Sequence, residues 1–207
     1  MCIRDSDTAL ESGFDSLSGF YDAFRKSTGK APSATDSIHS LKVTQFQSPL
    51  GPLVAAADDR AVYLLEFWDR RMLETQFSVL EKRIGAALFP GTNGPLAQLQ
   101  EEVDLYFQGQ LTRFETPIHT PGTEHQRQVW RALLRVPYGQ TLSYGQVAAK
   151  IGRPASTRPV ARAVGENRLA IVIPCHRIVG HDGQLTGYGG GLWRKRYLLN
   201  LEQNRGQ

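Results

Sequence analysis

Two short helical patterns separated by a turn constrain the fold of this chain more than any other feature. The first follows Ser143, whose side chain can cap a helix, and Gly152 can end that helix. Pro154 forbids continuation, and a second pattern begins near Arg158, with Pro159 in its first turn. This arrangement is typical of a helix-turn-helix, although an ordinary helical hairpin with solvated arginines would give the same pattern.

The distribution of charge favours a polyanionic partner for the same half of the chain. Residues 121–207 carry 13 Lys and Arg against 4 Asp and Glu, whereas residues 1–120 carry 11 against 16. A basic half suits nucleic acid, but charge alone does not decide this. No apolar run approaches the roughly 20 residues of a membrane span, and the N-terminus lacks the apolar core of a signal peptide. We therefore expect a cytosolic protein without a membrane partner.

Apolar periodicity divides the chain into three segments. Residues 7–34 predict a helix, and a linker-like stretch follows it. Residues 41–67 contain three strand candidates separated by turn signals, and two amphipathic helices come next. We predict an α+β protein, with a small α/β domain at residues 41–120 and a mostly helical domain at residues 121–207. The predicted apolar helix faces are Leu73, Phe77, Leu80 and Ile84; Leu96, Leu99, Val103, Tyr106 and Phe107; and Val129, Trp130, Leu133, Leu134 and Val136.

The segment IVIPCHRIVG, residues 171–180, places a thiol, an imidazole and a guanidinium at the end of an apolar run. Cysteine reacts as the thiolate, so its pKa has to fall from about 8.5 for fast reaction at neutral pH. A nearby histidine can lower it, and a carboxylate can orient the histidine. Pro174 suits a defined turn before Cys175. A buried, inert cysteine beside two surface groups would give the same letters, so the residues alone leave both interpretations open.

Three motifs resemble the O6-alkylguanine-DNA alkyltransferases, a family of DNA-repair methyltransferases. They are VPYGQTLSYGQVAAKIGRP, ENRLAIVIPCHRIVG and LTGYGGGLWRKRYLL, and the similarity extends over residues 41–207. The resemblance implies a ribonuclease-H-like α/β domain followed by a winged helix-turn-helix domain. It implies irreversible, stoichiometric transfer of an alkyl group, such as methyl, from O6-alkylguanine in DNA to a cysteine of the protein. Activity on O4-alkylthymine and the preferred size of the alkyl group stay open.

Matching positions receive their roles from this resemblance. Cys175 corresponds to the acceptor thiol, His176 to the base that deprotonates it through a water, and Glu202 to the carboxylate that orients the histidine. Asn167 resembles the asparagine that braces the active-site turn, and Tyr144 resembles the tyrosine that assists proton delivery to the leaving guanine. The remaining predictions are Tyr188, Pro174 and Gly189 in the substrate pocket, and Arg158, Arg162, Thr157 and Ser143 at the DNA.

The sequence departs from the family pattern at the arginine that fills the space of the flipped base. The family's RAVG begins at Arg162, but the spacing to Cys175 favours Arg158. Pro159 follows Arg158 where alanine is usual, and proline disfavours helical dihedrals at the residue before it. We predict that Arg158 is the arginine that replaces the base.

The resemblance also implies the partners. We expect double-stranded DNA carrying O6-alkylguanine, bound through its minor groove by a monomer, nearly independently of sequence. We expect no metal and no cofactor, because two cysteines and five scattered histidines do not suit a four-ligand zinc site. The expected compartment is the bacterial cytosol and nucleoid.

The N-terminal segment has a resemblance of its own. Residues 9–33 are similar to the last part of an AraC-type DNA-binding domain, which precedes an alkyltransferase in adaptive-response regulators. We therefore interpret residues 1–35 as a partial helix-turn-helix of such a fusion, although its first six residues match nothing in that family.

Two rival functions remain at this point. One is a DNA-binding regulator or lesion sensor without chemistry, which the presence of Cys175 disfavours. The other is a cysteine hydrolase that uses Cys175, His176 and Glu202, which the basic helix-turn-helix half disfavours.

Overall fold

The computed structural model describes residues 39–204 of the chain. The helix expected at residues 7–34, the linker after it and the partial helix-turn-helix expected at residues 1–35 lie outside the described residues. The described residues belong to one compact unit, which begins at His39. This unit runs through a sheet with two helices and then through a mainly helical part, so the predicted α+β class is confirmed.

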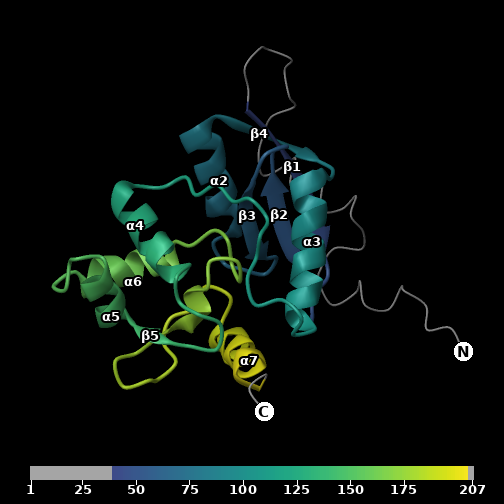
Figure 1. Cartoon of the computed structure of the whole chain (residues 1–207). Coiled ribbons are helices and arrows are strands. Elements are labelled where there is room, and N and C mark those ends of the chain that lie inside the picture. The colour runs from purple at the N-terminus through teal and green to yellow at the C-terminus, as the bar shows by residue number, and fades with distance from the viewer. Residues whose placement is uncertain (1–38, 205–207) are drawn as a thin grey trace, which may run out of the picture. The chain divides into compact units, whose positions relative to one another are not determined.

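A four-stranded sheet forms the first part of the unit (Figure 1). Its strands are β1 (His39–Phe46), β2 (Leu53–Ala57), β3 (Val62–Phe67) and β4 (Ala86–Pro90). The order across the sheet is β3-β2-β1-β4. The pairs β1–β2 and β2–β3 are antiparallel, whereas β4 runs parallel to β1. All residues of β2 and β3 are buried, so these two strands form the centre of the core.

Two helices accompany the sheet, as predicted. Helix α2 (Leu73–Ile84) contacts β3 and β4, and helix α3 (Gly94–Phe107) contacts β2 and β3. Strand β4 was not predicted. Gly85, in a left-handed conformation, ends α2 directly before this strand, and Pro90 closes it at the sheet edge. A five-residue apolar run between a helix and a turn cannot be assigned from periodicity, which explains the omission.

The second part of the unit is built from helices. They are α4 (Glu124–Leu133), α5 (Tyr144–Lys150), α6 (Thr157–Gly165) and α7 (Leu192–Gln203), with a 3-10 turn η1 (Cys175–Arg177). Two short parallel strands, β5 (Leu142–Ser143) and β6 (Ile178–Val179), join the start of α5 to the end of η1. Helix α4 contacts both α5 and α6.

The predicted helix signals of the second part are confirmed with one exception. The Ser143 hydroxyl accepts a hydrogen bond from the backbone N–H of Gln146 at 3.2 Å, which caps α5. Gly152 is left-handed just after that helix, at φ 72°, and Pro159 lies in the first turn of α6. Leu134 was expected in the apolar stripe of α4 but is 45 % exposed, because the helix ends at Leu133.

Edge strand β3 connects the two parts. The N–H of Val62 donates to Pro117 O at 2.8 Å, in the segment that leads to α4. Further along, the N–H of Leu65 donates to Arg168 O at 2.9 Å, and the N–H of Ala170 donates back to Leu65 O at 2.7 Å. The sheet therefore holds the segment that precedes Cys175.

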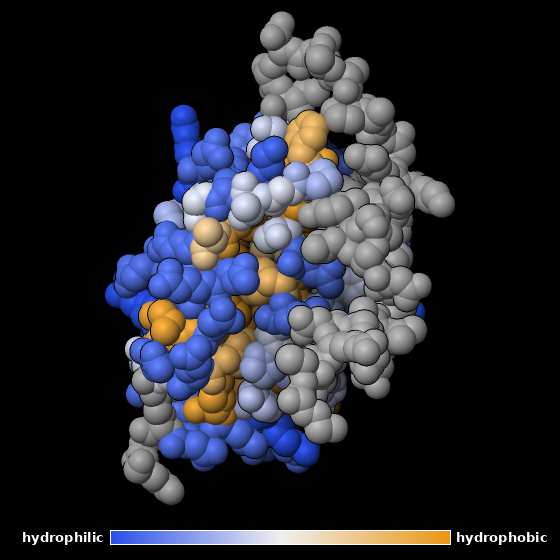
Figure 2. Space-filling view, turned by 90° about the vertical axis from the view of Figure 1, so that its right-hand side faces the viewer, coloured by the Kyte–Doolittle hydropathy of each residue, from blue (hydrophilic) through white to orange (hydrophobic). Residues whose placement is uncertain are grey.

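The face of the molecule shown in Figure 2 is mainly polar. On the face shown in Figure 2, hydrophilic residues surround scattered hydrophobic ones outside the grey region. Within residues 39–204, none of the helices is both long and apolar enough to cross a membrane.

Candidate active site

A cavity of about 410 Å³ opens beside Cys175, a size that suits a small organic ligand. Its wall combines both parts of the unit. The first part contributes residues from the segment Glu66–Met72, which begins with the last two residues of β3 and which we call the strap. The second part contributes Tyr144 at the start of α5, the end of α6 and the loop Gly187–Gly190.

The apolar run before Cys175 forms a turn rather than a strand. Ile171 has a positive φ of 69°, which is unusual for a branched residue, and the N–H of Ile173 donates to Leu169 O at 2.8 Å. Cys175 then opens the 3-10 turn η1. This places the thiol on the cavity wall while the chain around it stays buried.

One side-chain amide holds this turn together. Asn167 Nδ2 donates to Ile173 O at 2.9 Å, to Leu169 O at 3.3 Å and to the Cys175 sulfur at 3.1 Å. Its Oδ1 accepts from the N–H of Leu169 at 3.0 Å. Asn167 therefore links the turn to the Cys175 sulfur.

Glu202 forms a buried ionic cluster behind the thiol. Its carboxylate lies 2.8 Å from His176 Nε2 and accepts hydrogen bonds from Arg177 at 2.8 and 2.9 Å. It also accepts from the Tyr106 hydroxyl at 2.7 Å and from the N–H of Gly139 at 3.1 Å. Burial alone would raise the pKa of Glu202, but the hydrogen bonds from His176 and Arg177 outweigh it and lower the pKa to about 2.

The ionised carboxylate defines the tautomer of His176. An acceptor at Nε2 requires the proton on Nε2, which leaves Nδ1 as the basic nitrogen. That Nδ1 is buried without a hydrogen-bond partner among the described residues. Burial lowers the pKa of His176 below 6.5, so the ring is neutral at rest and able to accept a proton.

The resting thiol differs from the expectation of a lowered pKa. Burial raises the pKa of Cys175, and the Asn167 hydrogen bond and the charges of Arg70 and Lys195 offset only part of this effect. His176 cannot act as a neighbouring cation, because it is neutral. The thiolate must therefore form by proton transfer during the reaction rather than persist at rest.

The three predicted pocket residues do not all line the same cavity. Gly189 and Tyr188 line the cavity, and the Tyr188 hydroxyl is buried without a hydrogen-bond partner among the residues described. Pro174 lies instead on a second cavity of about 720 Å³, whose lining does not include Cys175. Tyr144 lines the first cavity, donates to Thr186 O at 3.4 Å, and has a pKa raised by burial, so it stays a proton donor.

Three of the predicted DNA-binding residues lie on α6, and the fourth, Ser143, precedes α5. Thr157, Arg158 and Arg162 are exposed, whereas the Ser143 hydroxyl is engaged as the α5 cap. Arg158 shares a helix face with Ala161 and Gly165, which line the cavity. Arg162 forms a surface ion pair with Glu166 at 2.9 Å.

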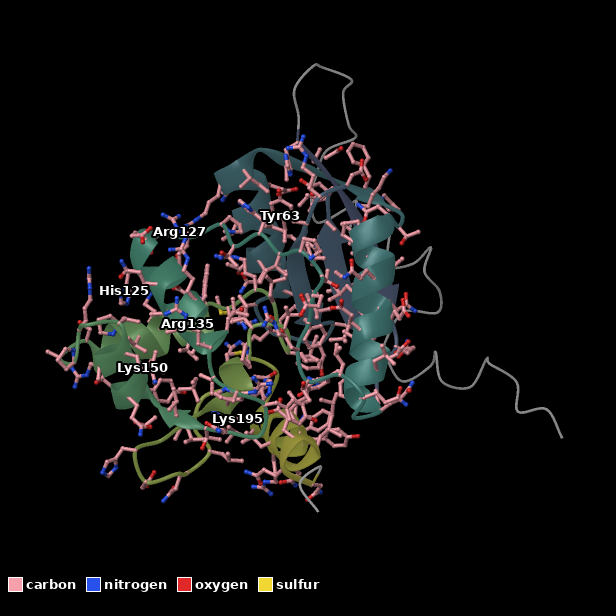
Figure 3. The ribbon with its side chains drawn as sticks, in the orientation of Figure 1. Tyr63, His125, Arg127, Arg135, Lys150 and Lys195 are labelled. Atoms are coloured by element: carbon pink, nitrogen blue, oxygen red, sulfur yellow. The ribbon has the colours of Figure 1, made fainter. Side chains whose placement is uncertain are left out.

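Four residues of the site were not predicted. Arg177 and Tyr106 bind Glu202, and Lys195 donates from α7 to Thr186 O at 2.6 Å and to Ile178 O. Figure 3 shows Lys195 beside α7, with Arg127, Arg135 and Lys150 in the helical part. Arg70 comes from the strap, and no signal in the sequence links it to the thiol. Within residues 39–204, no cluster of three or more His, Cys, Asp or Glu side chains could hold a metal ion.

Two protein families match the chain in succession. Residues 41–120 match the ribonuclease-like domain of 6-O-methylguanine DNA methyltransferase, and residues 124–204 match the DNA binding domain of the same protein. Together they span the sheet-bearing part and the helical part described above.

Individual relatives agree with these matches. The methylated-DNA–protein-cysteine methyltransferase of Mycolicibacterium paratuberculosis is 43 % identical over 163 residues, 79 % of this chain and 93 % of the relative. The protein of the same name from Salmonella typhimurium is 40 % identical over 163 residues, 76 % of this chain and 93 % of the relative. The crystal structure of Mycobacterium tuberculosis OGT in complex with DNA is similar with a TM-score of 0.68 and 38 % identity, covering 80 % of this chain and 94 % of that one.

Proposed function

The chain belongs to the 6-O-methylguanine DNA methyltransferase family, and from that premise we propose that Cys175 is the residue that accepts the alkyl group. The protein is a methylated-DNA–protein-cysteine methyltransferase, which repairs DNA by transferring an alkyl group to one of its own cysteines. The observation that carries the assignment of Cys175 is its place on the cavity wall, with Asn167 on its sulfur and with His176, which is paired with Glu202, as its neighbour in the chain.

We assign each step of the reaction to a residue of the site. His176 Nδ1 takes the thiol proton through one water, and the sulfur attacks the alkyl carbon of the flipped base. The carbon–O6 bond breaks, its electron pair stays on guanine, and Tyr144 donates a proton to the departing base. The product is a thioether, which water does not readily cleave, so each protein molecule acts once.

Intact-protein mass spectrometry tests this function. The protein is incubated with a duplex carrying one O6-methylguanine, and we expect a gain of one methyl group per protein molecule, mapped to Cys175. An unmodified duplex of the same sequence should give no gain. Methylation of another residue would contradict the assignment of Cys175.

We also propose how the protein meets DNA. Helix α6 enters the minor groove, and the partner is a duplex with O6-alkylguanine, bound by a monomer with little dependence on sequence. Support comes from the exposed Thr157, Arg158 and Arg162 on the helix whose end lines the cavity, and from the basic character of residues 121–207. The cytosol and nucleoid are the compartments that follow from this substrate.

Arg158 is expected to replace the flipped base, because it lies on the α6 face that carries Ala161 and Gly165 to the cavity. The variant Arg158→Ala should slow single-turnover repair of a duplex by roughly 10–100-fold, since unstacking a base costs a few kcal/mol. Arg162→Ala removes only an exposed ion pair and should change the rate by less than about two-fold.

A single-stranded oligonucleotide with the same lesion provides the control. There is no stack to fill in a single strand, so the defect of Arg158→Ala should be smaller on it. A larger loss in Arg162→Ala than in Arg158→Ala would assign the role to Arg162 instead.

We further propose that residues 1–35 derive from the AraC-type domain of an adaptive-response regulator fused to the alkyltransferase. The support is the similarity of residues 9–33 to the last part of such a domain. Sequencing the genomic region upstream of the first codon tests this origin.

A further inference from the structure

The strap places one buried arginine against the cavity of the thiol. The Arg70 side chain is only 8 % exposed and pairs with the buried Glu66. Its Nη2 donates to Gly165 O at 2.8 Å, and its Nη1 donates to Asn167 O at 3.0 Å. These carbonyls belong to the last residue of α6 and to the residue whose side chain holds the Cys175 sulfur.

The pocket loop packs directly on the strap. A Cβ added at Gly189 would lie 2.7 Å from Arg70 Cζ, and one added at Gly190 would lie 2.6 Å from the Phe67 ring. The Phe67 ring leaves no room for a side chain at Gly190, and a side chain at Gly189 would displace the Arg70 guanidinium, so the glycines allow the loop to approach this closely. Arg70 is thereby enclosed between the end of α6, Asn167 and the loop that carries Tyr188.

Several charged or titratable groups surround the thiol. Arg70 has the largest influence among the cations, followed by Lys195 of α7, and both favour the thiolate. Tyr144 and Tyr188 also face this region, but burial raises the pKa of each hydroxyl, so both stay neutral. His176 is neutral as well, and Glu202 is paired with it and with Arg177.

Glu66 fixes Arg70 rather than acting on the thiol. One of its oxygens pairs with Arg70 and the other accepts from the N–H of Phe67 at 3.1 Å. The buried pair orients the guanidinium so that two of its nitrogens reach the two carbonyls separately, whereas a lysine at this position would bring a single nitrogen.

We propose that Arg70 is a positioning residue for alkyl transfer, which couples α6 to the thiol through the carbonyls of Gly165 and Asn167 and supplies positive charge beside the sulfur. This inference rests on the proposed role of Cys175. Because the strap begins at the end of β3, Arg70 would connect the sheet-bearing part of the unit to the reaction at Cys175. When α6 enters the DNA groove, any shift of this helix would be transmitted to the same two carbonyls to which Arg70 donates.

The experiment separates charge from geometry with two variants in a Cys2→Ser background, which leaves one thiol. Arg70→Gln removes the charge, and Arg70→Lys keeps it but offers one nitrogen where Arg70 uses two to reach the carbonyls of Gly165 and Asn167. Thiol reactivity is measured with iodoacetamide between about pH 7 and 11. Methyl transfer from an O6-methylguanine duplex is measured in single turnovers, and Arg60→Gln, an exposed arginine of the β2–β3 turn, is the matched control.

In Arg70→Gln, loss of a neighbouring cation raises the pKa of the thiol, so the midpoint of the iodoacetamide profile should move up by about one pH unit. Arg70→Lys should keep the midpoint within about half a unit, yet transfer methyl from DNA several-fold more slowly, because its charge remains and its second carbonyl bond is lost. Arg60→Gln should match the parent protein in both measurements.

An unchanged midpoint in Arg70→Gln, or a parental transfer rate in Arg70→Lys, would overturn the proposal. Should Arg70→Gln fail to fold, Arg70→Lys decides: a parental midpoint with slower transfer supports the coupling, and a parental rate refutes it. Failure of the underlying function looks different, because the Cys2→Ser parent would then gain no methyl group from the duplex.

Discussion

A Cys175→Ala variant is expected to gain no methyl group from an O6-methylguanine duplex while it continues to bind that duplex. The substitution removes the thiol from the cavity wall. It does not touch the exposed face of α6, where we place the DNA contacts. Loss of chemistry with retention of binding therefore distinguishes the acceptor from a residue that merely supports the fold.

The fold should survive this change. Asn167 Nδ2 loses the sulfur but keeps the carbonyls of Leu169 and Ile173, so no buried donor is left unpaired. The lost volume is one sulfur atom, and the expected cost in free energy of unfolding is about 1 kcal/mol. Urea unfolding checks this, and a fluorescence titration with the lesion duplex checks binding.

The possible outcomes separate the rival functions. If Cys175→Ala still gained a methyl group, the acceptor would be a residue other than Cys175. Absence of gain in both the parent and the variant, with binding intact, would indicate a lesion sensor without chemistry. A hydrolase would turn over many substrate molecules, whereas the parent should stop after one methyl group per molecule.

The chemistry of the site could be predicted where sequence and space coincide. Cys175 and His176 share one motif, and the resemblance supplied Glu202, which the structure places 2.8 Å from the histidine. The α5 cap at Ser143 and the turn at Gly152 follow local rules of helix ends, which need no tertiary contact. These two helix-end features are encoded within a few residues and were predicted correctly.

Features that depend on tertiary packing could not be predicted. The pKa of Cys175 is set by burial, which neighbours in the sequence do not reveal, so the expected lowering was not found. Pro174 adjoins the thiol in the chain but faces another cavity. Arg70 reaches Asn167 only because β3 pairs with the segment at Leu169, a contact between distant parts of the chain.

Replacing Glu202 by Gln should have the largest effect on stability. Glu202 is buried and binds His176, Arg177 and Tyr106. Glutamine carries no charge, so the buried Arg177 guanidinium loses its counter-ion. Such a loss typically lowers the free energy of unfolding by about 3–5 kcal/mol. Urea unfolding measures this loss, and Glu115→Gln is the matched control, because its ion pair with Arg113 is exposed and should contribute little.

The same variant should show a characteristic dependence on pH. The folded pKa of Glu202 is lowered to about 2 from 4.5, so its stabilising effect is complete above pH 4.5 and is lost as the pH falls towards 2. This difference corresponds to about 3 kcal/mol. In Glu202→Gln that part of the acid dependence should be absent, and an unchanged acid profile would show that the carboxylate is not ionised in the folded protein.

Alkyl transfer should slow in Glu202→Gln for a separate reason. A neutral amide can accept from or donate to His176 Nε2, so it no longer fixes the tautomer that leaves Nδ1 free to take the thiol proton. We expect single-turnover methyl transfer to fall by about a hundredfold at neutral pH, in the range of a lost general base. Measuring the rate without urea, at a temperature well below the unfolding midpoint, separates the loss of activity from the loss of stability. A parental rate in a destabilised variant would mean that Glu202 supports the fold alone and that His176 is oriented by other contacts.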